Sequence, residues 1–233
     1  MTRVLMVISA ADSLTFADGT QHPTGFWAEE VAASHEYLAQ AGIEVDLASP
    51  GGRQPTVDPL SLDSKGGVEP GEAERFRTYL TGLETQLAAP LPLADVDLAG
   101  YDAIYIPGGH APMTDLVVDQ DLGRLLSEAV DSAKPVAALC HGVAALLSAG
   151  DEKDWFYKGR RMTGFTDAEE VQGGYGENIP FSVEESLRDR GAQLEVGAPW
   201  SDTVVVAGTL VTGQNPQSSV STAKALIRVL SAA

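Results

Sequence analysis

Cys140 and His141 are the residues of this sequence whose types and spacing most directly suggest chemistry. Cys140 is the only cysteine; it follows the apolar run 135–139 and precedes His141, Gly142 and a second apolar run. A thiolate is a strong nucleophile, and an adjacent imidazole can serve as its base. A cysteine at the start of a helix also meets the positive end of the helix dipole, which lowers the thiol pKa. We therefore expect Cys140 to be acidic and easily oxidised.

Other residue types would complete such a site. A carboxylate can orient the imidazole, and backbone N–H groups at a glycine turn can stabilise an oxyanion. The segment "PGGH", with Gly108, Gly109 and His110, follows an apolar run like the one before Cys140. A second carboxyl group, buried beside the sulfur, would have a raised pKa and could carry a proton. The alternative is that Cys140 is only a small buried core residue.

Strand and helix signals alternate along the chain. Strands are predicted at 3–10, 43–50, 101–109, 134–140 and 193–199, with a β-hairpin at 202–216. Helices are predicted at 25–42, 72–87, 114–133, 141–150, 180–192 and 218–233. This order predicts an α/β fold, a mostly parallel sheet with helices on both faces, in a single domain spanning 1–233. Ligands bind such sheets at the carboxyl ends of the strands, where the "PGGH" turn and Cys140 fall.

Composition and charge limit the classes of function. A single cysteine allows no internal disulfide, which fits a reducing cytoplasm. The formal net charge of -18 repels phosphate backbones and anionic membranes, so we expect neither a specific nucleic acid nor a membrane as partner. The four histidines and one cysteine lack the close spacing of a zinc site, and no phosphate-binding loop is present. We therefore expect no metal and no cofactor. The tryptophans Trp27, Trp155 and Trp200 are expected in the core or at an interface.

An ordered set of motifs resembles the ThiJ/PfpI superfamily. The carrying segments are "YIPGGHAPMTDL" and "PVAALCHGVAAL". "ADGTQHPTGFWAEEV", "TGFTDAEE" and "VTGQNPQSS" are similar to one branch of it, which contains glutathione-independent glyoxalases (glyoxalase III) and related heat-shock chaperones. The resemblance covers nearly the whole chain. It implies a flavodoxin-like fold related to the class I glutamine amidotransferases, and a homodimer.

The resemblance also implies roles for individual residues. It places the catalytic set at Cys140, His141, Glu170 and Glu30, where Glu170 orients the histidine and Glu30 contacts the sulfur. It places the oxyanion-binding amides at Gly109 and His141, with Gly108 and His110 beside them in the substrate pocket. Each acid has an acidic neighbour, Glu29 and Glu169, and the sequence leaves open which member of each pair faces the site.

The implied activity is that of a cysteine-dependent glyoxalase III-like lyase of the D-lactate dehydratase type. Cys140 would form a hemithioacetal with a small 2-oxoaldehyde such as methylglyoxal, and His141 or Glu30 would move a proton between its two carbons. Hydrolysis would release a hydroxy acid, lactate for methylglyoxal, without glutathione or another cofactor. Two alternatives use the same residues differently. One is a protein deglycase, amidase or peptidase, and the other is a holdase chaperone of the stress response in which Cys140 senses redox state.

Overall fold

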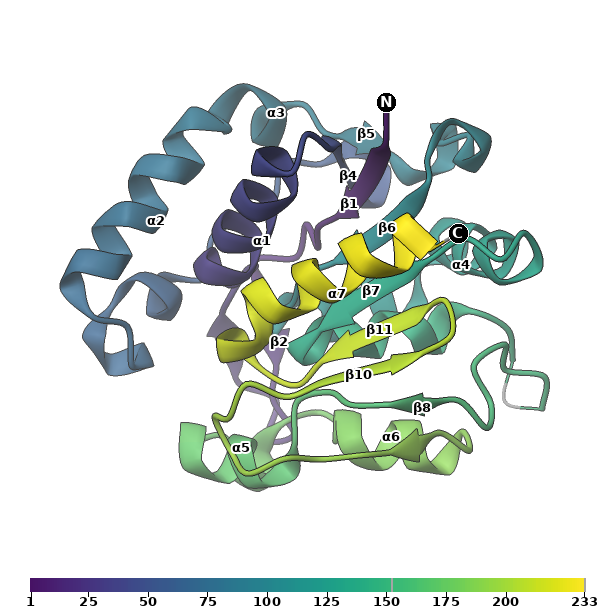
Figure 1. Ribbon diagram of the computed structural model, residues 1–233. Helices are drawn as coiled ribbons and strands as arrows, with labels where there is room; N and C mark the ends of the chain where they lie inside the picture. Colours follow the sequence, from purple (N-terminus) through teal and green to yellow (C-terminus); the bar gives the residue numbers. More distant parts are fainter. Residues whose placement is uncertain (152, 233) are drawn as a thin grey trace.

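A seven-stranded, mostly parallel sheet forms the centre of the computed structural model, which describes residues 1–151 and 153–232 (Figure 1). The strand order is β10-β11-β7-β6-β1-β4-β5. The strands are β1 (Arg3–Val7), β4 (Glu44–Ser49), β5 (Leu91–Pro92), β6 (Ala103–Ile106), β7 (Val136–Leu139), β10 (Val204–Ala207) and β11 (Leu210–Gly213). Within this sheet only β10 pairs antiparallel, with β11. The row β4-β1-β6-β7-β11 reads second, first, third, fourth, fifth along the chain, which is the flavodoxin-like order.

Helices cover both faces of this sheet. They are α1 (Ala28–Gln40), α2 (Pro70–Gly82), α3 (Glu84–Ala88), α4 (Gln120–Asp131), α5 (Asp167–Gly173), α6 (Val183–Asp189) and α7 (Ser219–Ala232). Helices α1 and α7 lie on one face and α4 on the other (Figure 1). Two small sheets flank the main one: β2 (Ser13–Thr15) with β3 (Gln21–Pro23), and β8 (Arg161–Met162) with β9 (Gln193–Leu194).

The central strands are apolar on both faces because helices bury both. In β1, Val4 and Met6 pack with α1 and α7, whereas Leu5 and Val7 pack with α4. All four side chains are fully buried. This packing fixes the carboxyl ends of β6 and β7 side by side, and these are the ends from which the "PGGH" turn and Cys140 emerge.

The structure confirms the α/β class, the parallel sheet and the hairpin, and it corrects two predicted elements. The segment predicted as a helix at 141–150 is a tighter 3₁₀ helix, Cys140–Ser148, whose residues from Cys140 to Leu147 are all buried. The predicted strand at 193–199 is reduced to Gln193–Leu194, because Gly197 and Pro199 follow and weaken strand pairing. Among the described residues, no helix is both long and apolar enough to cross a bilayer.

Two glycines let the ends of β6 and β7 approach each other. A Cβ atom on Gly142 would lie 2.6 Å from the carbonyl oxygens of both Ile106 and Pro107. A Cβ atom on Gly108 would lie 2.8 Å from the amide nitrogen of Gly142. Since both obstacles are backbone atoms, any side chain at either position would push the two turns apart.

We therefore expect Gly142→Ala to destabilise the fold by about 1–3 kcal/mol, the usual cost of overpacking a tight contact. Chemical denaturation measures this cost. Gly71→Ala is the matched control, because a Cβ atom there meets nothing within 4 Å. Equal stabilities for the two variants would contradict the close approach.

Candidate active site

Cys140 sits at a strained turn between β7 and the 3₁₀ helix. Its φ is +55°, a left-handed conformation that non-glycine residues rarely adopt. Such a strand-to-helix turn projects a nucleophile above the edge of a sheet, as the sequence predicted. The Cys140 side chain lines a cavity of about 770 Å³, yet the residue is only 3% exposed. The sulfur is therefore reached only through that cavity.

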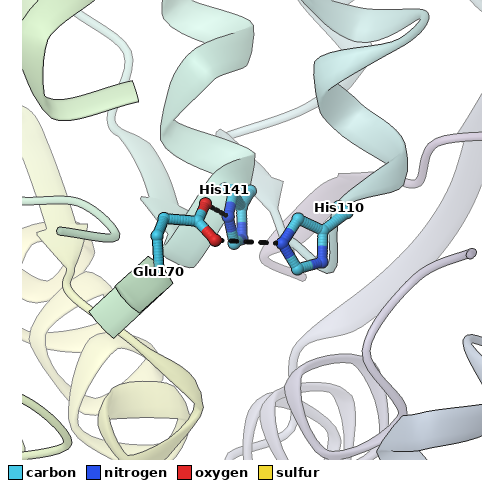
Figure 2. A group of neighbouring side chains, drawn as sticks. All are labelled: His110, His141 and Glu170. Atoms are coloured by element: carbon cyan, nitrogen blue, oxygen red, sulfur yellow. Dashed lines mark hydrogen bonds and ion pairs between the residues drawn. The ribbon is translucent and has the colours of Figure 1, made fainter. Parts of the chain in front are cut away.

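His141 bridges the sulfur and a buried carboxylate. Its Nδ1 lies 3.3 Å from Cys140 Sγ, and its Nε2 lies 2.6 Å from Glu170 Oε1. Figure 2 shows the carboxylate of Glu170, from α5, joined by one oxygen to the ring of His141 and by the other to the ring of His110. Because a carboxylate accepts hydrogen bonds, Nε2 carries the proton and Nδ1 presents a lone pair to the thiol. This is the tautomer that lets His141 act as a base toward Cys140.

The ionisation of the pair follows from its burial. Burial lowers the pKa of His141, and the neighbouring His110 lowers it further against the opposing pull of Glu170. Burial alone would raise the pKa of Glu170, but attraction to His141 and hydrogen bonds from His110 and His141 prevail and lower it to about 2. At neutral pH the site thus holds a carboxylate beside a neutral imidazole.

Glu30 lies on the other side of the sulfur, fully buried on α1. Its Oε2 accepts a 2.6 Å hydrogen bond from the amide of Gly108. Burial raises the pKa of Glu30 to about 8, although the adjacent Cys140 thiol and the hydrogen bond from Gly108 partly oppose this. The other carboxyl oxygen, Oε1, has no hydrogen-bond partner in the described part of the chain. Glu30 is therefore protonated at neutral pH, the condition under which it can donate a hydrogen bond to the sulfur.

The expectation of an acidic Cys140 is corrected by the structure. Burial, followed by the charge and hydrogen bonding of Glu30, raises the thiol pKa well above its ordinary value. The backbone N–H groups of Gly109 and His141 lower it but do not prevail. The sequence indicated the helix end but not the depth of burial. Because two buried groups in contact do not both ionise, Cys140 and Glu30 together retain at least one proton at neutral pH.

The structure separates Glu30 from Glu29. Glu29 lines the outer cavity rather than contacting Cys140. Its pKa is raised to about 7 by burial and by Glu72, with Arg75 opposing. Glu30, not Glu29, is the acid beside the sulfur.

Glu170 and Glu169 are likewise distinct. Glu169 is buried and points away from His141, and Oε1 accepts hydrogen bonds from the Trp200 amide and from the side chains of Gln214 and Asn215. Its Oε2 accepts two more from the amide and hydroxyl of Thr166, closing a capping box at the start of α5. Glu169 thus anchors α5, and α5 positions Glu170. The sequence signal for this role was Thr166 three residues before Glu169.

The two glycines of the "PGGH" turn do different things. The amides of Gly109 and His141 face the sulfur, where they favour negative charge and lower the thiol pKa. The amide of Gly108 is donated to Glu30, and a role of Gly108 in binding substrate stays a prediction. Gly109 adopts φ +92°, and a Cβ atom there would lie 2.4 Å from the Gly25 carbonyl oxygen.

Aromatic side chains that the sequence did not single out shape the cavity. Phe165 stacks on the His141 ring at 4.2 Å, and Tyr175 packs edge-on against His110 at 4.6 Å. Both line the cavity, as does His110. Trp27 and Trp200 also line it, in contrast to their expected core or interface positions, whereas Trp155 is a core residue. The glycines around Tyr175, in "GGYG", predict a turn. They were the signal in the sequence that could have indicated a loop lining the cavity.

The site also gathers ligand-type groups from three segments. The ring nitrogens of His110 and His141 and a carboxylate oxygen of Glu170 all lie within 4.8 Å of one another. Spacing along the sequence could not reveal this group, because its three residues lie 29 to 60 positions apart.

Comparison with known proteins identifies the family of the chain. The DJ-1/PfpI family profile matches residues 23–229. Glyoxalase 3 of Candida albicans is 28% identical over 97% of this chain and 98% of its own length. Glutathione-independent glyoxalase HSP31 of Saccharomyces cerevisiae is 29% identical over 95% and 94%. Glutamine amidotransferase-like class 1 domain-containing protein 1 of Bos taurus is 32% identical over 78% and 79%.

A solved structure extends the likeness to the fold. The crystal structure of glyoxalase III from Candida albicans aligns with a TM-score of 0.83 over 98% of this chain and 97% of that one, at 28% identity.

The burial of Glu30 has a measurable cost. Its folded-state pKa of about 8 exceeds the ordinary 4.5, so its contribution to stability falls as pH rises between these values. The loss at neutral pH is on the order of 3 kcal/mol. Gln keeps the size and the hydrogen bond from Gly108 but cannot ionise. We expect Glu30→Gln to melt at a higher temperature than wild type, by a margin that grows from pH 5 to about 8.

Thermal melting across this pH range provides the measurement, with Glu36→Gln, at a half-buried acid further along the same helix, as the control. A margin that is absent or independent of pH would contradict the buried carboxyl.

Glu169 and Glu170 should respond differently to the same change. Glu169→Gln places an amide donor among five donors, so we expect a loss of roughly 1–3 kcal/mol. Glu170→Gln should cost much less, because the amide oxygen can accept from His141 and the amide N–H can donate to His110 Nε2 once that ring carries its proton on Nδ1. Denaturation of the two variants tests this contrast, and a more stable Glu169→Gln would reverse the assignment.

Proposed function

Because this chain belongs to the DJ-1/PfpI family, we propose that it is a glutathione-independent glyoxalase that converts methylglyoxal-type 2-oxoaldehydes to 2-hydroxy acids. The observation that carries the proposal is the arrangement around Cys140: His141 and Glu170 on one side of the sulfur and the protonated carboxyl of Glu30 on the other. The whole-length similarity to Glyoxalase 3 of Candida albicans supports the substrate class.

In the first step, the Cys140 thiol gives its proton to Nδ1 of His141, and the sulfur attacks the aldehyde carbon. Glu170 stabilises the imidazolium through its hydrogen bond to Nε2. The amides of Gly109 and His141 stabilise the oxyanion, an effect worth about 3 kcal/mol per donor in other enzymes. The imidazolium then protonates the oxyanion, which gives a neutral hemithioacetal and returns His141 to its neutral form.

In the second step, His141 removes the hydrogen from the carbon bonded to sulfur, which gives an enediolate. A proton passes between the two neighbouring oxygens, and His141 delivers its proton to the second carbon. The product is the thioester of lactate, and water hydrolyses it to lactate and the free thiol. We assign this proton transfer to His141, which lines the cavity, rather than to Glu30, which is fully buried behind the sulfur. Glu30 instead holds a proton against the sulfur.

A second candidate uses the same residues on a larger substrate. The cavity of about 770 Å³ extends from Cys140 past Trp27 to Lys65 and Glu72, beyond what a three-carbon aldehyde occupies. That space favours deglycation of an early adduct between a 2-oxoaldehyde and a side chain. It does not favour the holdase alternative, because a chaperone has no use for a buried thiol flanked by two carboxyl groups.

We also propose a cellular location and an oligomeric state. A reducing cytoplasm keeps the lone thiol available for catalysis. We further propose that residues 1–233 form one domain that works as a homodimer.

The decisive test is lactate formation from methylglyoxal without glutathione or added metal. We expect many turnovers per protein for wild type, none for Cys140→Ala, and a loss of roughly a hundredfold for Glu170→Gln, the lower range for disabling an acid–base group. Chiral analysis of lactate is the readout, since side chains scavenge methylglyoxal without turnover.

Glu29→Gln is the matched control, because Glu29 is the adjacent acid that does not contact the sulfur. Lactate formation that survives Cys140→Ala would contradict the mechanism. Turnover of glycated peptides but not of free methylglyoxal would favour the deglycase.

A further inference from the structure

We propose that His110, His141 and Glu170 form a binding site for a divalent cation of the zinc class, and that a cation bound there switches the thiol site off. The two imidazoles and one carboxylate are the ligand types that zinc prefers. Figure 2 shows the three side chains together. All three residues are buried, and both histidines line the cavity.

The distances suit such a cation. Ligands bound at 2.0–2.1 Å in a tetrahedral arrangement lie about 3.3 Å apart. His110 Nε2 and Glu170 Oε2 already lie 3.4 Å apart. His141 Nε2 and Glu170 Oε1 lie 2.6 Å apart because a proton joins them, and this pair would separate once the cation replaces that proton. Because both histidines line the cavity, water in the cavity can supply a fourth ligand.

The surroundings hold the ligands in place. Phe165 and His110 flank the His141 ring at 4.2 Å and 4.1 Å, and Tyr175 packs against His110. The Glu169 hydrogen bonds anchor α5, which carries Glu170. Little side-chain freedom is lost on binding, so the site is already organised for a cation.

A cation at Nε2 changes the chemistry of His141. Neutral His141 carries its proton on Nε2 and offers Nδ1 to Cys140. Coordination through Nε2 moves that proton to Nδ1, with no net gain or loss. Nδ1 is then a donor and no longer accepts the thiol proton. The cation also takes up the Glu170 carboxylate that would stabilise an imidazolium. The base is lost while the nucleophile and the oxyanion amides stay in place.

Zinc titration of the Cys140→Ser protein tests the site without the thiol and without any assumption about the reaction catalysed. Competition with a chromogenic zinc chelator gives the affinity. We expect one zinc ion per chain, with affinity weakened at least about tenfold by adding His110→Ala. His22→Ala is the matched control, since the His22 ring lies 6.4 Å from that of His110 and outside the ligand group. Cooperative melting of each variant confirms that it is folded.

A second measurement uses Co²⁺ on the wild-type protein. We expect visible bands of a tetrahedral nitrogen–oxygen site without the intense near-ultraviolet band of a cobalt–thiolate bond. In the wild type, Zn²⁺ should inhibit turnover and EDTA should restore it. Zinc binding that is unaffected by His110→Ala, or that is lost in Cys140→Ser, would overturn the proposal, and so would a thiolate band with Co²⁺.

Discussion

A buried carboxyl group held against a buried thiol is the interaction on which the rest of this site depends. Glu30 reaches Cys140 only because α1 packs on the sheet and the Gly108 amide fixes its carboxyl group. Burial alone would make two such acids a liability, since neither is easily ionised away from water. The remaining groups make ionisation of the thiol easier. The amides of Gly109 and His141 favour negative charge on the sulfur, and Nδ1 of His141 can accept the thiol proton.

The backbone makes that contact possible. Cys140 holds a left-handed conformation, and Gly108 and Gly142 allow the turns after β6 and β7 to touch. The free-energy cost of this strain is offset by the apolar core packed on both faces of β1 and its neighbouring strands. Helix α5 then adds the last component: Glu169 anchors the helix, and the next residue, Glu170, fixes the tautomer of His141. Of these two adjacent acids, Glu169 thus has a structural role and Glu170 a chemical one.

The sequence was sufficient to predict features that follow from the order of elements along the chain. It was less informative about features that depend on how deeply a side chain is buried. Strand–helix alternation and the Cys140–Gly142 turn predicted the parallel sheet and the placement of Cys140, and the motif resemblance pointed to Glu30 and Glu170. The prediction of a low pKa for Cys140 was wrong. The sequence indicates the helix end that lowers the thiol pKa, but it does not show that the residue is 3% exposed and beside a carboxyl group. Phe165 and Tyr175 were missed because their role depends on loops that fold over the cavity. The two-residue strands β5 and β8 are too short to leave a pattern.

Infrared difference spectroscopy of the carboxyl C=O stretch tests the central claim that Glu30 keeps its proton at neutral pH. The spectrum of wild type minus Glu30→Gln isolates this one group among 33 acidic residues. We expect the band of a protonated carboxylic acid at pH 7, and its replacement by carboxylate bands as the pH passes about 8. A difference spectrum that shows only carboxylate at pH 7 would contradict the account.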